Sequence, residues 1–326
     1  MIEPSLRLIS NARLIAGVFA GALLSGCASL FFPQATSLRD AKPADLPARV
    51  ELQEVPFFPQ SEYQCGPAAL ATVLSHARVK VTPDDLVPQV YVPARQGSLQ
   101  VEMLAAARRH GMVSYQLAPR FEDLLREIAA GTPVIVLQDL GIGPFERWHY
   151  AVAMGYDLDE NDLVLRSGEK ERQVLPTAIH ELVWKKSGYW AMVALPPERI
   201  AATADESRWL TAVAALERAG NPRAARTAYA KFLERWPDNV NASIGLANTY
   251  YTAKELKEAE KVLRRALARQ PDSVVALNNL AQVVSDQGKH SEALPLVERA
   301  ASLGGPFASA VHETRALILK RLDGRR

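Results

Sequence analysis

The chain has 326 residues, enough for about two domains of ordinary size. Hydrophobic residues make up 48% and charged residues 23%, which excludes wholesale disorder and a polytopic membrane protein. The 38 basic and 36 acidic side chains nearly cancel, so the charge gives no indication of a nucleic-acid partner, and two cysteines are too few for a disulfide scaffold or a cysteine-based zinc site.

The N-terminus has the pattern of a secretion signal. The apolar run Leu14–Leu24 has eleven residues, too few to span a bilayer and typical of the core of a signal peptide. It ends in Leu-Ser-Gly-Cys27, which resembles the lipobox of bacterial lipoproteins. The resemblance implies a signal peptide over residues 1–26, cleavage before Cys27, and lipid on its sulfur and new amine. Such an anchor is firm, since two acyl chains already hold a protein on a membrane.

Residues 27–50 contain three prolines and scattered polar residues, which predicts a tether between the membrane and the first domain. Ala28, rather than Asp, follows Cys27. This resembles outer-membrane sorting in organisms with two membranes. We therefore expect a protein of the cell envelope, facing the periplasm from the outer membrane if the organism has one.

Residues 51–197 mix helix and strand patterns. Helices are predicted after Cys65 and at two later amphipathic segments, and four short β-branched or aromatic runs predict strands. The expected helices are 66–76, 99–109 and 121–130, and the expected strands are 133–137, 150–156, 162–166 and 190–195. Helices followed by consecutive strands favour an α+β domain.

Residues 198–326 are rich in Ala, Leu, Glu and Arg and contain an internal repeat. Pro237 and Pro271 are 34 residues apart, as are Ala225, Ala259 and Ala293. A 34-residue period is that of tetratricopeptide repeats, which predicts an all-α solenoid. The expected repeats are 206–239, 240–273 and 274–307, followed by a capping helix over 308–321. Such repeats usually bind peptides or proteins, so we expect a protein partner or substrate on this surface.

If Cys27 carries lipid, Cys65 is the single thiol of the mature chain. A cysteine at a helix start has its thiolate stabilised by backbone N–H groups and the helix dipole. A thiol enzyme also needs a base. His149, at the mouth of a predicted strand, is suitably held. The other histidines of this domain are less suitable: His76, about 16 Å along the same helix, and His110 and His180.

Three segments carry a family resemblance. The segment Gln-x(4)-Cys-Gly-Pro-Ala-Ala-Leu at 60–70, Gly-x-Pro-Val-Ile-Val at 131–136, and His-Tyr-x-Val-x-x-Gly-Tyr-Asp at 149–157 resemble bacteriocin-processing, double-glycine-leader peptidases. The resemblance covers about residues 52–195 and implies a papain-like cysteine peptidase fold. It also implies that Cys65 is the nucleophile, His149 the general base and Gln60 the oxyanion-hole glutamine.

The chain departs from that pattern at two places. Gln60 lies five residues before the cysteine, where the family commonly has six, and Gln64 is its rival. The family's aspartate, which orients the histidine, aligns near Ser167, where no carboxylate stands. Ser167 or a backbone carbonyl could orient the imidazole, and Asp157 and Glu169 are possible substitutes.

These features leave three functions open. The leading one is an envelope-anchored cysteine peptidase whose repeats recruit substrate or partner. The alternative is a catalytically inactive peptidase-like lipoprotein adaptor, and the third is acyl transfer on the same dyad. No metal or cofactor is expected, because zinc-peptidase, phosphate-loop and nicotinamide motifs do not occur in the sequence.

Overall fold

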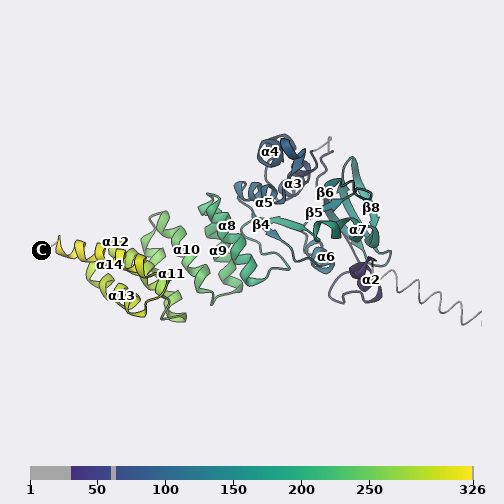
Figure 1. Cartoon of the computed structure of the whole chain (residues 1–326). Coiled ribbons are helices and arrows are strands. Elements are labelled where there is room, and N and C mark those ends of the chain that lie inside the picture. The colour runs from purple at the N-terminus through teal and green to yellow at the C-terminus, as the bar shows by residue number, and fades with distance from the viewer. Residues whose placement is uncertain (1–30, 60–63, 325–326) are drawn as a thin grey trace, which may run out of the picture. The chain divides into compact units, whose positions relative to one another are not determined.

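A computed structural model describes residues 31–59 and 64–324 of the chain (Figure 1). The predicted lipidation site Cys27 and the predicted oxyanion residue Gln60 lie outside the described residues. The chain divides into two compact units. The first unit comprises the chain up to Met103 together with Gln116–Val193, and the second comprises Leu104–Tyr115 and the residues from Ala194 onward.

A sheet of seven strands forms the centre of the α+β fold. Its order is β4-β9-β5-β6-β7-β8, and β1 pairs with the distal half of β6. The strands are β1 Arg49–Glu51, β4 Val113–Gln116, β5 Val134–Asp139, β6 Trp148–Asp157, β7 Asp162–Ser167, β8 Lys170–Pro176 and β9 Ala191–Leu195. Strand β6 is the longest, and it pairs antiparallel with β1, β5 and β7. Its residues Tyr150–Tyr156 are all buried, which agrees with the unbroken apolar pattern of that segment.

The helices of this fold are α3 Cys65–His76, α4 Pro83–Val90, α5 Gln100–Arg109, α6 Phe121–Ala129 and α7 Thr177–Trp184, the last followed by the short helix η2 Lys185–Ser187. Of these, α3, α6 and α7 pack against strands of the sheet. Helix α3 is buried from Gly66 to Leu74 and packs on β5 and β6. A second sheet pairs β2 Tyr91–Val92 with β3 Gly97–Ser98, on either side of the short helix η1 Pro93–Arg95. The predicted α+β class is confirmed, and the expected helices and strands lie within about two residues of those observed.

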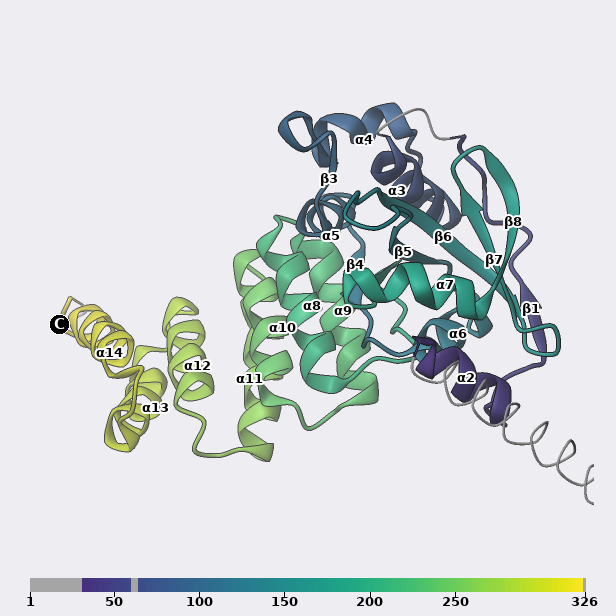
Figure 2. The same ribbon diagram turned by 45° about the vertical axis from the view of Figure 1, so that its right-hand side comes forward.

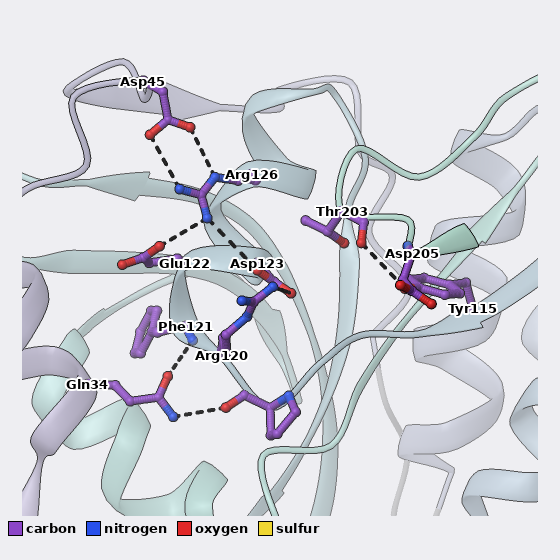
Figure 3. A network of polar contacts seen from close by, with 11 residues as sticks. Gln34, Asp45, Tyr115, Arg120, Phe121, Glu122, Asp123, Arg126, Thr203 and Asp205 are labelled. Carbon is purple, nitrogen blue, oxygen red and sulfur yellow. Dashed lines mark hydrogen bonds and ion pairs between the residues drawn. The ribbon is translucent and has the colours of Figure 1, made fainter. Parts of the chain in front are cut away.

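The predicted tether is wrong from Pro33 onward. Helix α2, Pro33–Asp40, buries Ala35 and Leu38, and the carboxylate of Glu181 accepts hydrogen bonds from the N–H groups of Gln34 (3.1 Å) and Ala35 (2.7 Å). Figure 3 shows the Gln34 side chain against Phe121, whose N–H donates to it.

Farther along the same segment, Asp45 accepts two hydrogen bonds from Arg126, and β1 then joins the sheet (Figure 3). Of the three prolines that suggested a linker, Pro33 begins α2, and Pro43 and Pro47 lie in the irregular segment that follows this helix.

The second unit is all-helical, as expected. Its helices are α8 Glu206–Arg218, α9 Pro222–Arg235, α10 Val240–Thr252, α11 Leu256–Arg269, α12 Val274–Asp286, α13 His290–Leu303 and α14 Ala308–Asp323. Each packs on the next, and Figure 2 shows them following one another as neighbouring helices. The three predicted repeats each contain one helix pair, and α14 is the predicted cap. Small residues permit this packing: a Cβ on Gly245 would lie 2.4 Å from the ring of Tyr229.

The segment Leu104–Tyr115 departs from the predicted boundary at 197, because it belongs to the second unit. The Tyr115 hydroxyl lies 3.4 Å from the carbonyl oxygen of Thr203 (Figure 3), and the Tyr115 ring packs edge-on against Trp209. Asn221 also donates to the carbonyl of Arg108. In the part of the chain that the structure describes, no helix has the length and apolarity needed to cross a membrane.

Candidate active site

Cys65 is the first residue of α3, and its thiol is free. The backbone N–H groups of Tyr150, Gly66 and Cys65 itself lie within hydrogen-bonding reach of the sulfur. Burial nevertheless raises the pKa of the thiol, because removal from water costs the thiolate more than these N–H groups return. The helix start thus supplies the expected N–H donors to the sulfur, and burial acts against them.

Gly66 is required by the protein's own packing. A Cβ at this position would lie 2.2 Å from the hydroxyl oxygen of Ser98 and 2.5 Å from its Cβ. Ser98 is the last residue of β3, and its carbonyl accepts a hydrogen bond from the hydroxyl of Tyr150 (3.1 Å). The absence of a side chain at Gly66 therefore lets β3 pack against the start of α3, and the hydrogen bond from Tyr150 connects β3 to β6.

His149 lies near the start of β6, and Ser167 ends β7 on the neighbouring strand. The Ser167 hydroxyl oxygen lies 2.9 Å from Nε2 of His149, and Ser167 is only 9% exposed. When Nε2 carries the proton, the Ser167 hydroxyl oxygen accepts a hydrogen bond from this N–H, which fixes the orientation of the ring. Nδ1 is then the nitrogen able to take a proton. The sulfur of Cys65 lies beside the N–H of Tyr150, the residue that follows His149.

The imidazole is neutral at physiological pH. Burial lowers the pKa of His149 to about 4, and the nearby charge of Arg147 acts in the same direction. Because the pKa of the Cys65 thiol is raised and that of His149 is lowered, both groups are uncharged in the free protein. Such a ring can act as a general base, which an imidazolium cannot.

The two carboxylates considered as orienters of the His149 ring, Asp157 and Glu169, lie at opposite ends of β7. Asp157 ends β6, eight residues from His149, which is about 26 Å along a strand at about 3.3 Å per residue. Its carboxylate accepts the N–H groups of Asp159 and Glu160 in the turn before β7. Asp157 therefore cannot orient the imidazole. Glu169 is exposed in the turn between β7 and β8.

Two other histidines of this domain have contacts within the fold. His180 is fully buried, its Nδ1 lies 3.0 Å from the amide nitrogen of Gln138, and burial lowers its pKa to about 3. His76, at the end of α3, hydrogen-bonds through Nε2 to the carbonyl of Gly131.

Two residues near the site, Tyr150 and Asp139, are not among the predicted site residues. Tyr150 brings its N–H to the sulfur and its hydroxyl to β3. Asp139 accepts the N–H groups of Gly141 and Arg147, at 2.8 Å each, and so fixes the connection that leads into His149. The signal for Asp139 was available, because an Asp two residues before a glycine is typical of such side-chain turns.

The described residues contain no group of three or more His, Cys, Asp or Glu side chains that could hold a metal ion. The site as described consists of a thiol, an imidazole, a hydroxyl and backbone N–H groups. These are the groups that nucleophilic acyl chemistry requires.

Comparison with known proteins identifies both parts of the chain. Residues 52–192 match the family model described as "Peptidase_C39 like family", and residues 210–274 and 258–310 match the tetratricopeptide repeat model. The chain therefore carries a C39-like peptidase domain followed by tetratricopeptide repeats. No curated protein matches the chain.

Three solved structures illustrate the similarity. A Bacillus anthracis protein described as a candidate C39-like peptidase is 16% identical, with a TM-score of 0.39 over 46% of this chain and 98% of that one. MamA is 18% identical, with a TM-score of 0.30 over 37% of this chain and 80% of that one. A thermophilic TPR protein of Thermus thermophilus is 22% identical, with a TM-score of 0.33 over 37% of this chain and 68% of that one.

Proposed function

We propose that this protein is a cysteine peptidase of the bacterial envelope, held on a membrane by lipid on Cys27, whose repeats recruit a substrate or partner protein. The observation that carries the proposal is the meeting of three elements. The start of α3 brings the Cys65 thiol to β6, and β7 holds the His149 ring through Ser167.

The mechanism follows from the neutral pair. As the sulfur of Cys65 attacks the peptide carbonyl carbon, the thiol proton passes to His149. The backbone N–H of Cys65 and the side-chain amide of Gln60 are the proposed donors to the carbonyl oxygen, which gains negative charge as the C–S bond forms.

The tetrahedral intermediate then collapses. The C–N bond breaks, and the imidazolium gives its proton to the leaving amine, which leaves a thioester on Cys65. Because the imidazolium is disfavoured in this site, it is a strong acid for that step. Water, deprotonated by the same ring, hydrolyses the thioester and restores the thiol. Ser167 acts as a positioning residue through its hydrogen bond to the ring.

The second candidate is a peptidase-like adaptor that binds a peptide without cutting it. Two observations favour it: the pKa of the thiol is raised, and the partner of the His149 ring is a hydroxyl rather than a carboxylate. A carboxylate would stabilise the imidazolium, and a hydroxyl does so less.

A peptidyl electrophile distinguishes the two candidates. The protein is treated with a panel of peptide acyloxymethyl ketones at pH 7.5, and the labelled residue is located by mass spectrometry. We expect labelling of Cys65, lost in Cys65→Ala and slowed about 10²-fold or more in His149→Ala, since a general base contributes at least that much. His76→Ala is the matched control, since His76 caps the far end of α3, and it should label normally. Equal rates in the wild type and His149→Ala would favour the adaptor.

A further inference from the structure

An exposed apolar loop leads into the candidate active site. The connection between β5 and β6, residues 140–147, together with Trp148, the first residue of β6, is here called the site hairpin. Its side chains at Ile142, Phe145 and Trp148 are 87%, 79% and 45% exposed. Side chains of this size in one short connection form an apolar tip rather than scattered surface residues. Trp148 immediately precedes His149, so the tip is covalently next to the base.

The site hairpin has a defined shape. Its ends are joined by a hydrogen bond from the N–H of Leu140 to the carbonyl of Arg147 (2.9 Å), and the carboxylate of Asp139 accepts two further N–H groups across the base. A Cβ on Gly141 would lie 1.8 Å from the carbonyl oxygen of Phe145, so the turn depends on a glycine. The turn is therefore fixed by these hydrogen bonds and by Gly141, and it presents the apolar side chains to solvent.

The N-terminal end of the described chain is attached beside the same turn. The ammonium of Lys186 donates to the carbonyl of Gly141 (3.0 Å) and to Asp139 (3.1 Å). The adjacent Lys185 donates to the carbonyl of Phe31 (2.9 Å) and lies 6.0 Å from the centroid of its ring. Lys186 thus holds the base of the site hairpin, and the adjacent Lys185 holds Phe31, which follows Cys27 by four residues in the sequence.

The residues around the tip are of the kinds found at membrane interfaces. Arg147 and Lys185 supply positive charge near its base, Lys186 is paired with Asp139, and Trp148 has an apolar ring whose N–H donates to Glu146. Apolar tips with basic and tryptophan residues behind them are typical of segments that enter the headgroup region of anionic bilayers. A lipid on Cys27 would place a bilayer within a few residues of Phe31, hence near this tip.

We propose that the site hairpin inserts into the lipid surface that carries the anchor, so that the active site opens toward the membrane. The proposal rests on the lipid anchor of the proposed function. It implies that the substrate is a peptide segment next to the bilayer, such as the juxtamembrane part of a membrane or lipid-anchored protein.

Brominated lipids test this contact. The full chain, expressed in bacteria and purified from their membranes, is reconstituted into vesicles of phosphatidylethanolamine and phosphatidylglycerol, with plain or brominated acyl chains. Tryptophan emission is recorded after flotation. Of the other four tryptophans, Trp184, Trp190 and Trp209 are buried and Trp236 is partly buried in the repeats, so the difference between the wild type and Trp148→Phe isolates the contribution of the site hairpin.

We expect brominated vesicles to quench the wild type and to quench Trp148→Phe severalfold less. The double variant Ile142→Ser, Phe145→Ser should lose most of the quenching of Trp148. In contrast, Val174→Ser, an exposed apolar position on β8, should leave it unchanged.

Three results would overturn the proposal. If the protein floats with vesicles but Trp148 is not quenched, the anchor stands and the membrane contact of the hairpin is refuted. If the wild type does not float, the anchor itself fails and the proposal falls with it. If Ile142→Ser, Phe145→Ser leaves quenching intact but lowers peptide cleavage without vesicles, the tip binds peptide instead of lipid.

Discussion

Replacing Ser167 with aspartate would place a carboxylate next to the ring of His149. The serine hydroxyl lies 2.9 Å from Nε2, and an aspartate at the same position reaches the same nitrogen with a charged oxygen. Because a carboxylate stabilises the imidazolium, the pKa of His149 should rise from about 4.

The size of the rise follows from the geometry. Two unit charges 4 Å apart attract by about 4 kcal/mol at an effective dielectric constant of 20, which corresponds to about three pKa units. Position 167 is nearly buried, so desolvation of the new carboxylate offsets part of this gain. We therefore expect a rise of about one to three units.

Histidine-selective NMR measures this directly. The signal of His149 is assigned by its absence in His149→Ala and titrated from pH 3.5 to 8 in the wild type, Ser167→Asp and Ser167→Asn. The asparagine variant has the same shape without the charge and should titrate close to the wild type. If the aspartate and asparagine variants titrate together, or the wild-type ring titrates near 6.5, the account of the neutral pair is refuted.

Four further predictions concern stability and packing. In the folded protein the pKa values of His149 and His180 are held below the ordinary 6.5, so the free energy of unfolding is highest above pH 6.5 and falls as the pH drops toward 4 and 3. Urea unfolding at pH 5 should show about 2 kcal/mol less stability for each histidine than at pH 7. An unchanged midpoint would contradict this. Gly66→Ala should lower the free energy of unfolding by about 1–3 kcal/mol and slow thiol labelling, as measured by urea titration and by the peptidyl electrophile, and normal labelling would show that the helix start tolerates the clash. Glu181→Gln should release α2, cost about 1–3 kcal/mol and expose the N-terminal segment to limited proteolysis, whereas a digestion pattern like the wild type's would mean that the carboxylate is dispensable. Gly245→Ala should destabilise the repeats by a similar amount through its clash with a neighbouring tyrosine ring, seen as a lower melting temperature in circular dichroism, and an unshifted transition would refute that packing argument.

Much of the fold could be predicted because its signals are local. The segment after Cys65 predicted α3, and the 34-residue period predicted every helix pair of the second unit. Helix α2 could not be predicted. It is only eight residues long, and its first N–H groups are satisfied by Glu181, 146 residues away in sequence from Ala35.

The candidate site was only partly predictable. In the pairing of β6 with β7, Val152 lies opposite Arg166 and Asp157 opposite Asp162, so Ser167 is at the end of β7 nearer the start of β6 and Asp157 is at the turn. This register favours Ser167 and depends on strand ends that sequence patterns locate poorly. The protonation states were beyond the sequence, since the pKa values of Cys65 and His149 are set by burial among residues that are distant in the chain.

The most direct test of the central claim is cleavage itself. A peptide library is incubated with wild-type protein, Cys65→Ala and His149→Ala, and new peptide termini are read by mass spectrometry. The account predicts a defined set of cleavages with the wild type and none with either variant. If the folded wild type, active-site thiol intact, produces no cleavage of any peptide, or all three proteins produce the same termini, the peptidase claim is contradicted.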